Sequence, residues 1–106
     1  MSGFTSLDAR TRFDPAKMQK QSLFESERMF CDLYCLEPGQ VQKAHAHVGS
    51  DKVYVVMTGE VLVRVGDEER LLPPGGAAWA GPGEEHALRN ASAARATVLV
   101  FMAPKP

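Results

Sequence analysis

The three histidines of the 106-residue chain are the residues whose type and spacing could do chemistry. His45 and His47 are two apart, and His86 stands alone further along the chain. Residues two apart on a strand point to the same face, so His45 and His47 can share one ion. Divalent transition metals bind neutral imidazole nitrogens at roughly 2.0–2.1 Å. We therefore predict a metal site with His86 as the third ligand, and Fe, Zn, Ni, Mn and Cu are all open.

Glycines and polar residues recur at fixed distances around these histidines. The first stretch contains Gly39, His45, His47, Lys52 and Gly59. The second stretch contains Gly75, Gly81, Pro82, Gly83, His86 and Asn90. In this spacing the chain resembles the cupin superfamily, whose first motif carries a His-x-His pair followed by a glutamate and whose second carries a single histidine. The two stretches span residues 39–90, about half of the chain.

The resemblance implies a fold, a site and a range of activities. It implies a double-stranded β-helix, or jelly-roll barrel, with a metal held by three histidines in the cavity and a small molecule that chelates it. It also implies several functions, because this fold hosts dioxygenases, isomerases, decarboxylases and binders without catalytic activity. A dioxygenase is the first enzymatic expectation, and a metal-dependent isomerase or a non-catalytic small-molecule-binding module is the alternative.

Two positions depart from the cupin pattern. Gly81 stands in place of a proline, although Pro82 next to it also presets a turn. Lys52 stands in place of the glutamate, which in cupins is often the fourth ligand, and an ammonium beside a dication cannot coordinate it. A bulge that turns Asp51 inward would restore a carboxylate ligand. Otherwise Lys52 lines the cavity or reaches its mouth, and with a depressed pKa it would be a candidate general base.

Strand alternation predicts which side chains share the cavity with the histidines. We expect Val41 and Lys43 to face the same way as His45, and Lys52 and Tyr54 to face inward from the following strand. Tyr54 has two interpretations, either packing in the core or offering its hydroxyl to a ligand as a second catalytic candidate.

Several other residues have a structural interpretation. Trp79 is expected to pack in the core. Cys31 and Cys35 are expected to be small buried hydrophobic residues without a disulfide, because they are too far apart on a strand to bond. The alternative for Cys35 is a ligand or redox role, if it faces the cavity. Arg64 and Arg89 are expected to be surface charges. Asn90 is expected to tie down a turn.

The remaining pattern predicts an all-β fold. Asp14 and Pro15 favour a short helical turn over residues 13–20. After it come short segments rich in Val, Leu, Phe, Tyr and Met, separated by glycine and proline. The expected strands are residues 21–25, 28–37, 40–47, 52–58, 60–66, 69–72, 77–80, 85–91 and 96–103. We expect an N-terminal arm over residues 1–20 and a single β-barrel domain over residues 21–106.

Composition limits the choice of partners. The net charge is −1 and no basic stripe is present, so no nucleic-acid partner is expected. No apolar run approaches the roughly 20 residues that span a bilayer, and the first residues lack the apolar stretch of a signal peptide, so we expect a cytoplasmic protein without a membrane partner.

The oligomeric state is predicted from two strands that are apolar on both faces. EVLVRV and ATVLVF leave few polar positions for an outer surface, and such a surface must be covered. A second copy of the chain would cover it in a homodimer, which is also common among cupins of this size. The alternative is that the N-terminal arm covers it within one chain.

Overall fold

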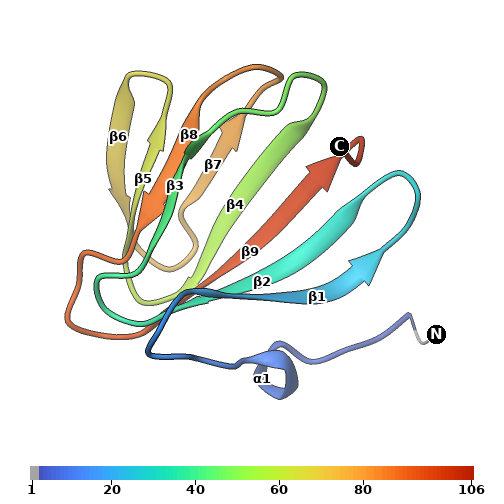
Figure 1. The fold of residues 1–106 in the computed structure, drawn as a ribbon. Coiled ribbons are helices and arrows are strands. Elements are labelled where there is room, and N and C mark those ends of the chain that lie inside the picture. Colours follow the sequence, from blue (N-terminus) through green and yellow to red (C-terminus); the bar gives the residue numbers. More distant parts are fainter. Residues whose placement is uncertain (1–2) are drawn as a thin grey trace.

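The computed structural model describes residues 3–106, which form two facing antiparallel sheets (Figure 1). A short helix, α1 (Leu7–Arg10), precedes the strands. The strands are β1 (Gln19–Glu25), β2 (Phe30–Leu36), β3 (Val41–His45), β4 (Asp51–Thr58), β5 (Val61–Val65), β6 (Glu68–Leu72), β7 (Ala77–Ala80), β8 (His86–Arg89) and β9 (Ala96–Ala103). One sheet has the order β1-β2-β9-β4-β7 and the other has the order β3-β8-β5-β6. The predicted all-β jelly-roll fold is confirmed.

The strands form where the sequence predicts them. Each of the predicted strands has its counterpart, and the observed ends lie within two residues of the predicted ends. β-branched and aromatic residues favour these segments. Positive φ angles, which other residues avoid, occur between them at Gly39, Gly59, Gly66, Gly75 and Gly83. None of the helices in residues 3–106 is long and apolar enough to cross a membrane.

The core lies between the two sheets and is built from the inward face of each. Its buried residues are Tyr34, Leu36, Tyr54, Val56, Val61, Val63, Leu88, Ala96, Val98 and Val100. Burying one Val or Leu side chain contributes about 1.5–3 kcal/mol. Along β4 the inward side chains change from Val56 through Tyr54 to Lys52. The interior is therefore apolar toward one end of the sandwich and polar toward the end that carries the β3–β4 loop.

The helical turn lies elsewhere than predicted. Residues 15–17 form a bend, and the helix is α1 instead. Asp14 does make the local bond of a cap, since its Oδ1 accepts the N–H of Ala16 at 2.7 Å. The chain then enters β1 at Gln19 after only a few residues, because Met18 packs against the core and the following residues pair with β2. The tertiary contacts override the local helix signal.

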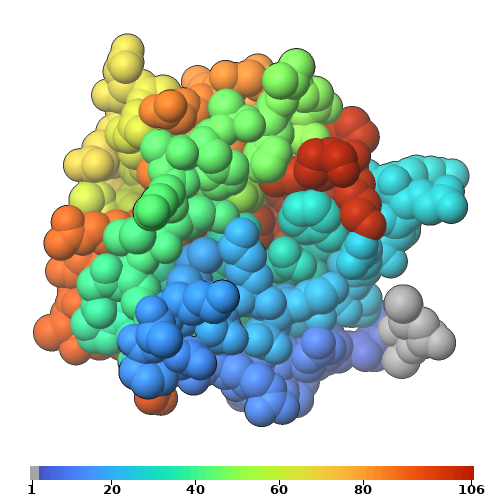
Figure 2. Space-filling view, viewed as in Figure 1, coloured from blue at the N-terminus to red at the C-terminus, as the bar shows by residue number. Residues whose placement is uncertain are grey.

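The part of the N-terminal arm that the structure describes, from residue 3 onward, lies against the outer face of the five-stranded sheet. Arg10 donates to the Ser22 carbonyl at 2.6 Å, and a groove of about 370 Å³ separates the arm from Phe24, Leu99 and neighbouring residues. In Figure 2 the dark blue segment runs along one side of the molecule beside β1 and β2. Cys31 and Cys35 on that face of β2 are buried free thiols, as expected.

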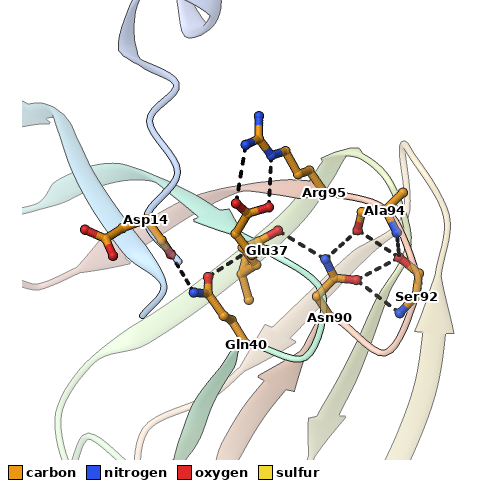
Figure 3. Close-up of polar contacts among 8 residues, drawn as sticks. Asp14, Glu37, Gln40, Asn90, Ser92, Ala94 and Arg95 are labelled. Atoms are coloured by element: carbon orange, nitrogen blue, oxygen red, sulfur yellow. Dashed lines mark hydrogen bonds and ion pairs between the residues drawn. The ribbon is translucent and has the colours of Figure 1, made fainter. Parts of the chain in front are cut away.

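Asn90 closes the end of the sandwich opposite the β3–β4 loop (Figure 3). Its buried amide donates to the carbonyls of Leu36 at 3.1 Å and Ala94 at 2.7 Å. Its Oδ1 accepts from the backbone N–H of Ser92 at 3.1 Å and from the Ser92 hydroxyl at 2.8 Å. The expectation that Asn90 ties down a turn is confirmed.

A second set of contacts in Figure 3 joins the arm to the same end of the sandwich. Arg95 pairs with Glu37 at 2.9 Å, and Gln40 donates to the Asp14 carbonyl at 2.7 Å. The Arg95 guanidinium also lies 4.5 Å from the centre of the Phe13 ring. These contacts hold the N-terminal arm to the end of the sandwich that lies away from the histidines.

Trp79 lies outside the core, which corrects the prediction for this residue. It is on β7, at the edge of the five-stranded sheet, and is 61% exposed. Its inward neighbours are the small residues Ala78 and Ala80, so the alternation places the large ring outside. The indole N–H donates to Asp51 Oδ1 at 2.8 Å.

Candidate metal centre

A β-bulge in β3 decides which of its side chains face the cavity. The pairing with β8 runs Val41 with Arg89 and Gln42 with Leu88, and then shifts before His45 pairs with His86. An extra residue at a bulge exchanges the faces of a strand. Gln42 is therefore buried, whereas Val41 and Lys43 are exposed, so the prediction that these two face inward was wrong.

The structure brings all three histidines together. His45 ends β3, His47 follows in the β3–β4 loop, and His86 begins β8 directly opposite His45. Their candidate ligand atoms all lie within 4.8 Å of one another. The ring centres of His45 and His86 are 4.3 Å apart. The backbone of His47 is fixed by its carbonyl, which accepts the N–H of Gly83 in the β7–β8 loop at 2.7 Å.

Backbone carbonyls orient two of these rings. Nδ1 of His45 lies 2.8 Å from the Lys43 carbonyl, and Nδ1 of His86 lies 3.0 Å from the Glu84 carbonyl. A carbonyl oxygen only accepts, so in the neutral imidazole that metal binding requires each Nδ1 carries the proton and each Nε2 keeps its lone pair. The same outer contact fixes metal-binding histidines in known sites.

The two Nε2 atoms face each other at 3.2 Å. Two lone pairs at this distance repel each other unless a cation lies between them. Two nitrogen ligands on one ion at about 2.0–2.1 Å are separated by about 2.9–3.4 Å, so the observed spacing suits a shared metal. Burial lowers the pKa of His86 to about 4, and burial and neighbouring positive groups lower the pKa of His47. The rings of His86 and His47 are therefore neutral at pH 7, as ligation requires.

Lys52 lies beside the histidines and is 2% exposed. Its Nζ is 3.4 Å from Nε2 of His45 and 3.5 Å from Oε1 of Gln42. Burial, reinforced by the positive charge of Lys20, lowers the pKa of Lys52 to about 8, while Asp32 acts in the opposite direction. The residue at the cupin glutamate position is thus a buried amine that lines the interior.

Gln42 joins two tyrosines to this interior. Its Oε1 accepts the Tyr54 hydroxyl at 2.6 Å, and its Nε2 donates to the Tyr34 hydroxyl at 3.0 Å. Burial raises the pKa of Tyr34 to about 12 and that of Tyr54 further still. Tyr54 therefore commits its proton to Gln42 and positions that amide. Sequence reasoning missed Gln42, because strict alternation in β3 places it on the outer face, and it missed Tyr34 of β2, because the hydrogen bond of Tyr34 to this site is made through Gln42.

The acidic residues near the histidines in sequence point elsewhere. Asp51 lies on the outer face of β4 and accepts the indole N–H of Trp79, so the structure does not bring it to the histidines. Glu84 accepts the backbone N–H of Gly81 at 3.1 Å. Glu85 pairs with Arg64 at 2.7 Å. Among residues 3–106, the cluster with metal-ligand spacing consists of the three histidines alone.

A groove of about 360 Å³ lies beside this centre. Val63 and Val65 of β5, Arg70 of β6 and Ala78 of β7 contribute to its walls. The histidines do not line it, although Val65 pairs directly with His86 across the sheet. The groove therefore lies next to His86, because Val65 and His86 are direct partners and point to the same face of the four-stranded sheet.

Comparison with known proteins agrees with this fold. The family model described as "Cupin domain" matches residues 32–102. No match was found among curated proteins. The chain belongs to the cupin family.

Solved structures resemble the chain over nearly its full length. The crystal structure of TT1209 from Thermus thermophilus is 53% identical, with a TM-score of 0.96 over 99% of this chain and 100% of that chain. A conserved protein with a double-stranded beta-helix domain from Klebsiella pneumoniae is 23% identical, with a TM-score of 0.90 over 98% of this chain and 91% of that chain. KdgF from a Halomonas species is 20% identical, with a TM-score of 0.86 over 100% and 96%. The last two show the fold alone.

Proposed function

We propose that this chain is a metal-dependent cupin that acts on a small organic molecule which chelates the metal. His45, His47 and His86 hold one divalent first-row transition metal. The observation that carries the proposal is the pair of Nε2 atoms facing each other at 3.2 Å, each kept free of a proton by a backbone carbonyl at the other ring nitrogen. Packing alone does not favour this arrangement, because two such lone pairs repel each other.

Dioxygenation is the first activity to test. Three imidazoles leave two or three positions on the ion for other ligands, and a bound Fe(II) would supply dioxygen activation there. The chain itself supplies the surroundings of the substrate. Tyr34, Tyr54 and Gln42 form one connected hydrogen-bonded wall that keeps its own polar atoms satisfied. Such a wall holds its shape when the substrate displaces water.

A metal-dependent isomerase is the second candidate, and Lys52 favours it. The pKa of its amine is lowered to about 8 by burial, which brings this group toward the range of a general base that works near neutral pH. Zn, Ni or Mn would serve as the Lewis acid in that case. Binding of a chelating ligand without turnover would instead identify a non-catalytic binding module.

The first experiment measures metal content by plasma mass spectrometry on tag-free protein. Wild type is compared with His45→Ala and His86→Ala, and Val48→Ala is the matched control because that side chain is exposed beside the site. We expect about one metal per chain in wild type and the control, and almost none in the two histidine variants. Less than about a tenth of a metal per chain after anaerobic reconstitution with Fe(II), Zn(II) and Ni(II) would contradict the proposal.

Activity is then assayed on the protein loaded anaerobically with Fe(II). Oxygen uptake is recorded with chelating β-diketones, 2-oxo acids and 2-hydroxy acids. Uptake that matches substrate loss, and is absent in His86→Ala, would support a dioxygenase. Proton exchange or isomer formation without oxygen uptake would favour the isomerase.

A further inference from the structure

The charge of Lys52 has no counter-ion in the interior. The side chain is buried, and among the described residues no carboxylate oxygen lies within 4.0 Å of its Nζ. Its polar contacts are an amide oxygen of Gln42 at 3.5 Å and a ring nitrogen of His45 at 3.4 Å, both long. A buried charge without a partner is costly, so proteins rarely keep one unless something else pairs with it.

The surroundings of Lys52 supply one negative charge, that of Asp32, against the positive charges of Lys52 and Lys20. The rings of Tyr34 and Tyr54 lie 5.6 Å and 5.3 Å from its Nζ, and both hydroxyls are protonated and engaged with Gln42. Lys20 adds a second positive charge 5.4 Å from the Tyr34 ring, and Asp32 on the same face of β2 offsets only one of the two. With a dication bound at the histidines, the interior is strongly positive.

Metal binding also removes one of the two contacts of Lys52. The Nε2 lone pair of His45 cannot accept from Lys52 and bind an ion at the same time. The ammonium would then be left with Gln42, close to the three histidines that would hold the ion. A ligand that is anionic at this point would satisfy both the ion and the ammonium, because a carboxylate has two oxygens and accepts strong charge-assisted hydrogen bonds.

We propose that the site selects small carboxylates, with Lys52 as the specificity-determining residue that pairs with the ligand's carboxylate while the ligand chelates the metal. This inference rests on the proposed function, since it needs the metal at the three histidines. It narrows the substrate from any chelating molecule to an organic acid. It also explains why a lysine stands at a position where a carboxylate ligand would otherwise add negative charge.

The test uses three probes of one carbon skeleton that differ in charge: oxalate, oxamate and oxamide. Each is titrated into Co(II)-loaded wild type and Lys52→Met, and binding is followed by the visible absorption of Co(II). Methionine keeps an unbranched side chain that is one atom shorter and removes the charge, and replacing a buried charge by an apolar residue is often neutral for stability. Lys20→Met is the matched control because it removes a cation further from the ion.

We expect Lys52→Met to bind oxalate about tenfold or more weakly than wild type, with oxamide affinity unchanged and Lys20→Met close to wild type. The bound ion would itself prefer carboxylates to amides. The informative quantity is therefore the change in oxalate affinity from wild type to Lys52→Met, and not the oxalate affinity of either protein alone. Metal content is measured before and after each titration, because oxalate can strip a metal.

Equal oxalate affinity in wild type and Lys52→Met, with full metal content in both, would overturn the carboxylate proposal and leave the metal site intact. An equal loss for oxalate and oxamide would also overturn it, because Lys52 would then act on the shape of the cavity instead of on charge. Wild type that takes up no metal would overturn both proposals, and this result is seen before any anion is added.

Discussion

At the residue scale, Lys52 determines how tightly the centre can hold an ion. Its ammonium lies 3.4 Å from Nε2 of His45, and a positive charge beside a dication is repelled. We expect Lys52→Glu to bind Zn(II) about tenfold or more tightly than wild type, because a carboxylate adds a fourth ligand and removes the repulsion. Competition with a chromophoric chelator measures this affinity.

Lys52→Gln separates the two causes. It removes the charge and adds no strong ligand, so its affinity should fall between wild type and Lys52→Glu. If Lys52→Glu binds Zn(II) no better than Lys52→Gln, the side chain at this position does not reach the ion, and the proposed geometry of the centre fails.

His86 makes the metal-free protein sensitive to acid. Burial lowers its pKa from 6.5 to about 4, so between these values the unfolded chain holds a proton that the folded chain does not. The stabilising contribution of a neutral His86 is therefore complete above pH 6.5 and is lost as the pH falls toward 4.

We expect the melting temperature of metal-free wild type to fall more than that of His86→Gln between about pH 7 and pH 4.5. Both proteins are measured with a chelator present, by differential scanning fluorimetry. The groups they share, including His47 and Asp32, contribute alike to both curves. Parallel curves would show that His86 titrates normally and is not desolvated.

At the element scale, the strands were predictable and one strand's faces were not. On β4 the alternation is unbroken, so the inward placement of Lys52 and Tyr54 follows from sequence alone. On β3 the bulge before His45 exchanges the faces, and no residue type marks that position. Gln42 was therefore missed. The metal cluster was predictable because it depends on three rare residues, whereas its hydrogen-bonded wall depends on a backbone irregularity.

The glycine between β4 and β5 is required by both conformation and space. Gly59 has φ +74°, and a Cβ there would lie 2.6 Å from the Arg95 carbonyl and 2.9 Å from the Cβ of Ala96. We expect Gly59→Ala to lower the free energy of unfolding by about 2–4 kcal/mol, since the left-handed backbone and the overpacking both cost energy. Denaturant titration followed by circular dichroism measures it.

Gly39→Ala is the matched control for this prediction. Gly39 has φ +83°, but a Cβ there would meet no heavy atom within 4 Å. Its substitution should cost only the backbone strain, about 1–2 kcal/mol. An equal loss of unfolding free energy in the two variants would show that the β8–β9 loop leaves room for a Cβ at Gly59, contrary to the structure.

At the scale of the whole molecule, part of the outer sheet face is left uncovered. The N-terminal arm lies over β1 and β2, but Trp79, Phe101 and Met57 are 61%, 40% and 37% exposed. Val53 pairs with both Trp79 and Phe101, so these side chains form one apolar surface on β4, β7 and β9. The arm therefore covers only part of the face for which the sequence predicts a partner.

We expect this surface to pair two copies of the chain. Sedimentation at micromolar concentration should give twice the mass of one chain, and Phe101→Lys should give a monomer because a charge cannot be buried in an apolar interface. Trp79 is the single tryptophan of the chain, so its emission should move to shorter wavelength as wild type associates and stay unshifted in Phe101→Lys.

Val48→Lys, on an exposed loop, is the control and should associate like wild type. Because all three histidines come from one chain, Phe101→Lys should still bind metal. A monomer mass for wild type at this concentration would contradict the homodimer and leave the metal centre unaffected.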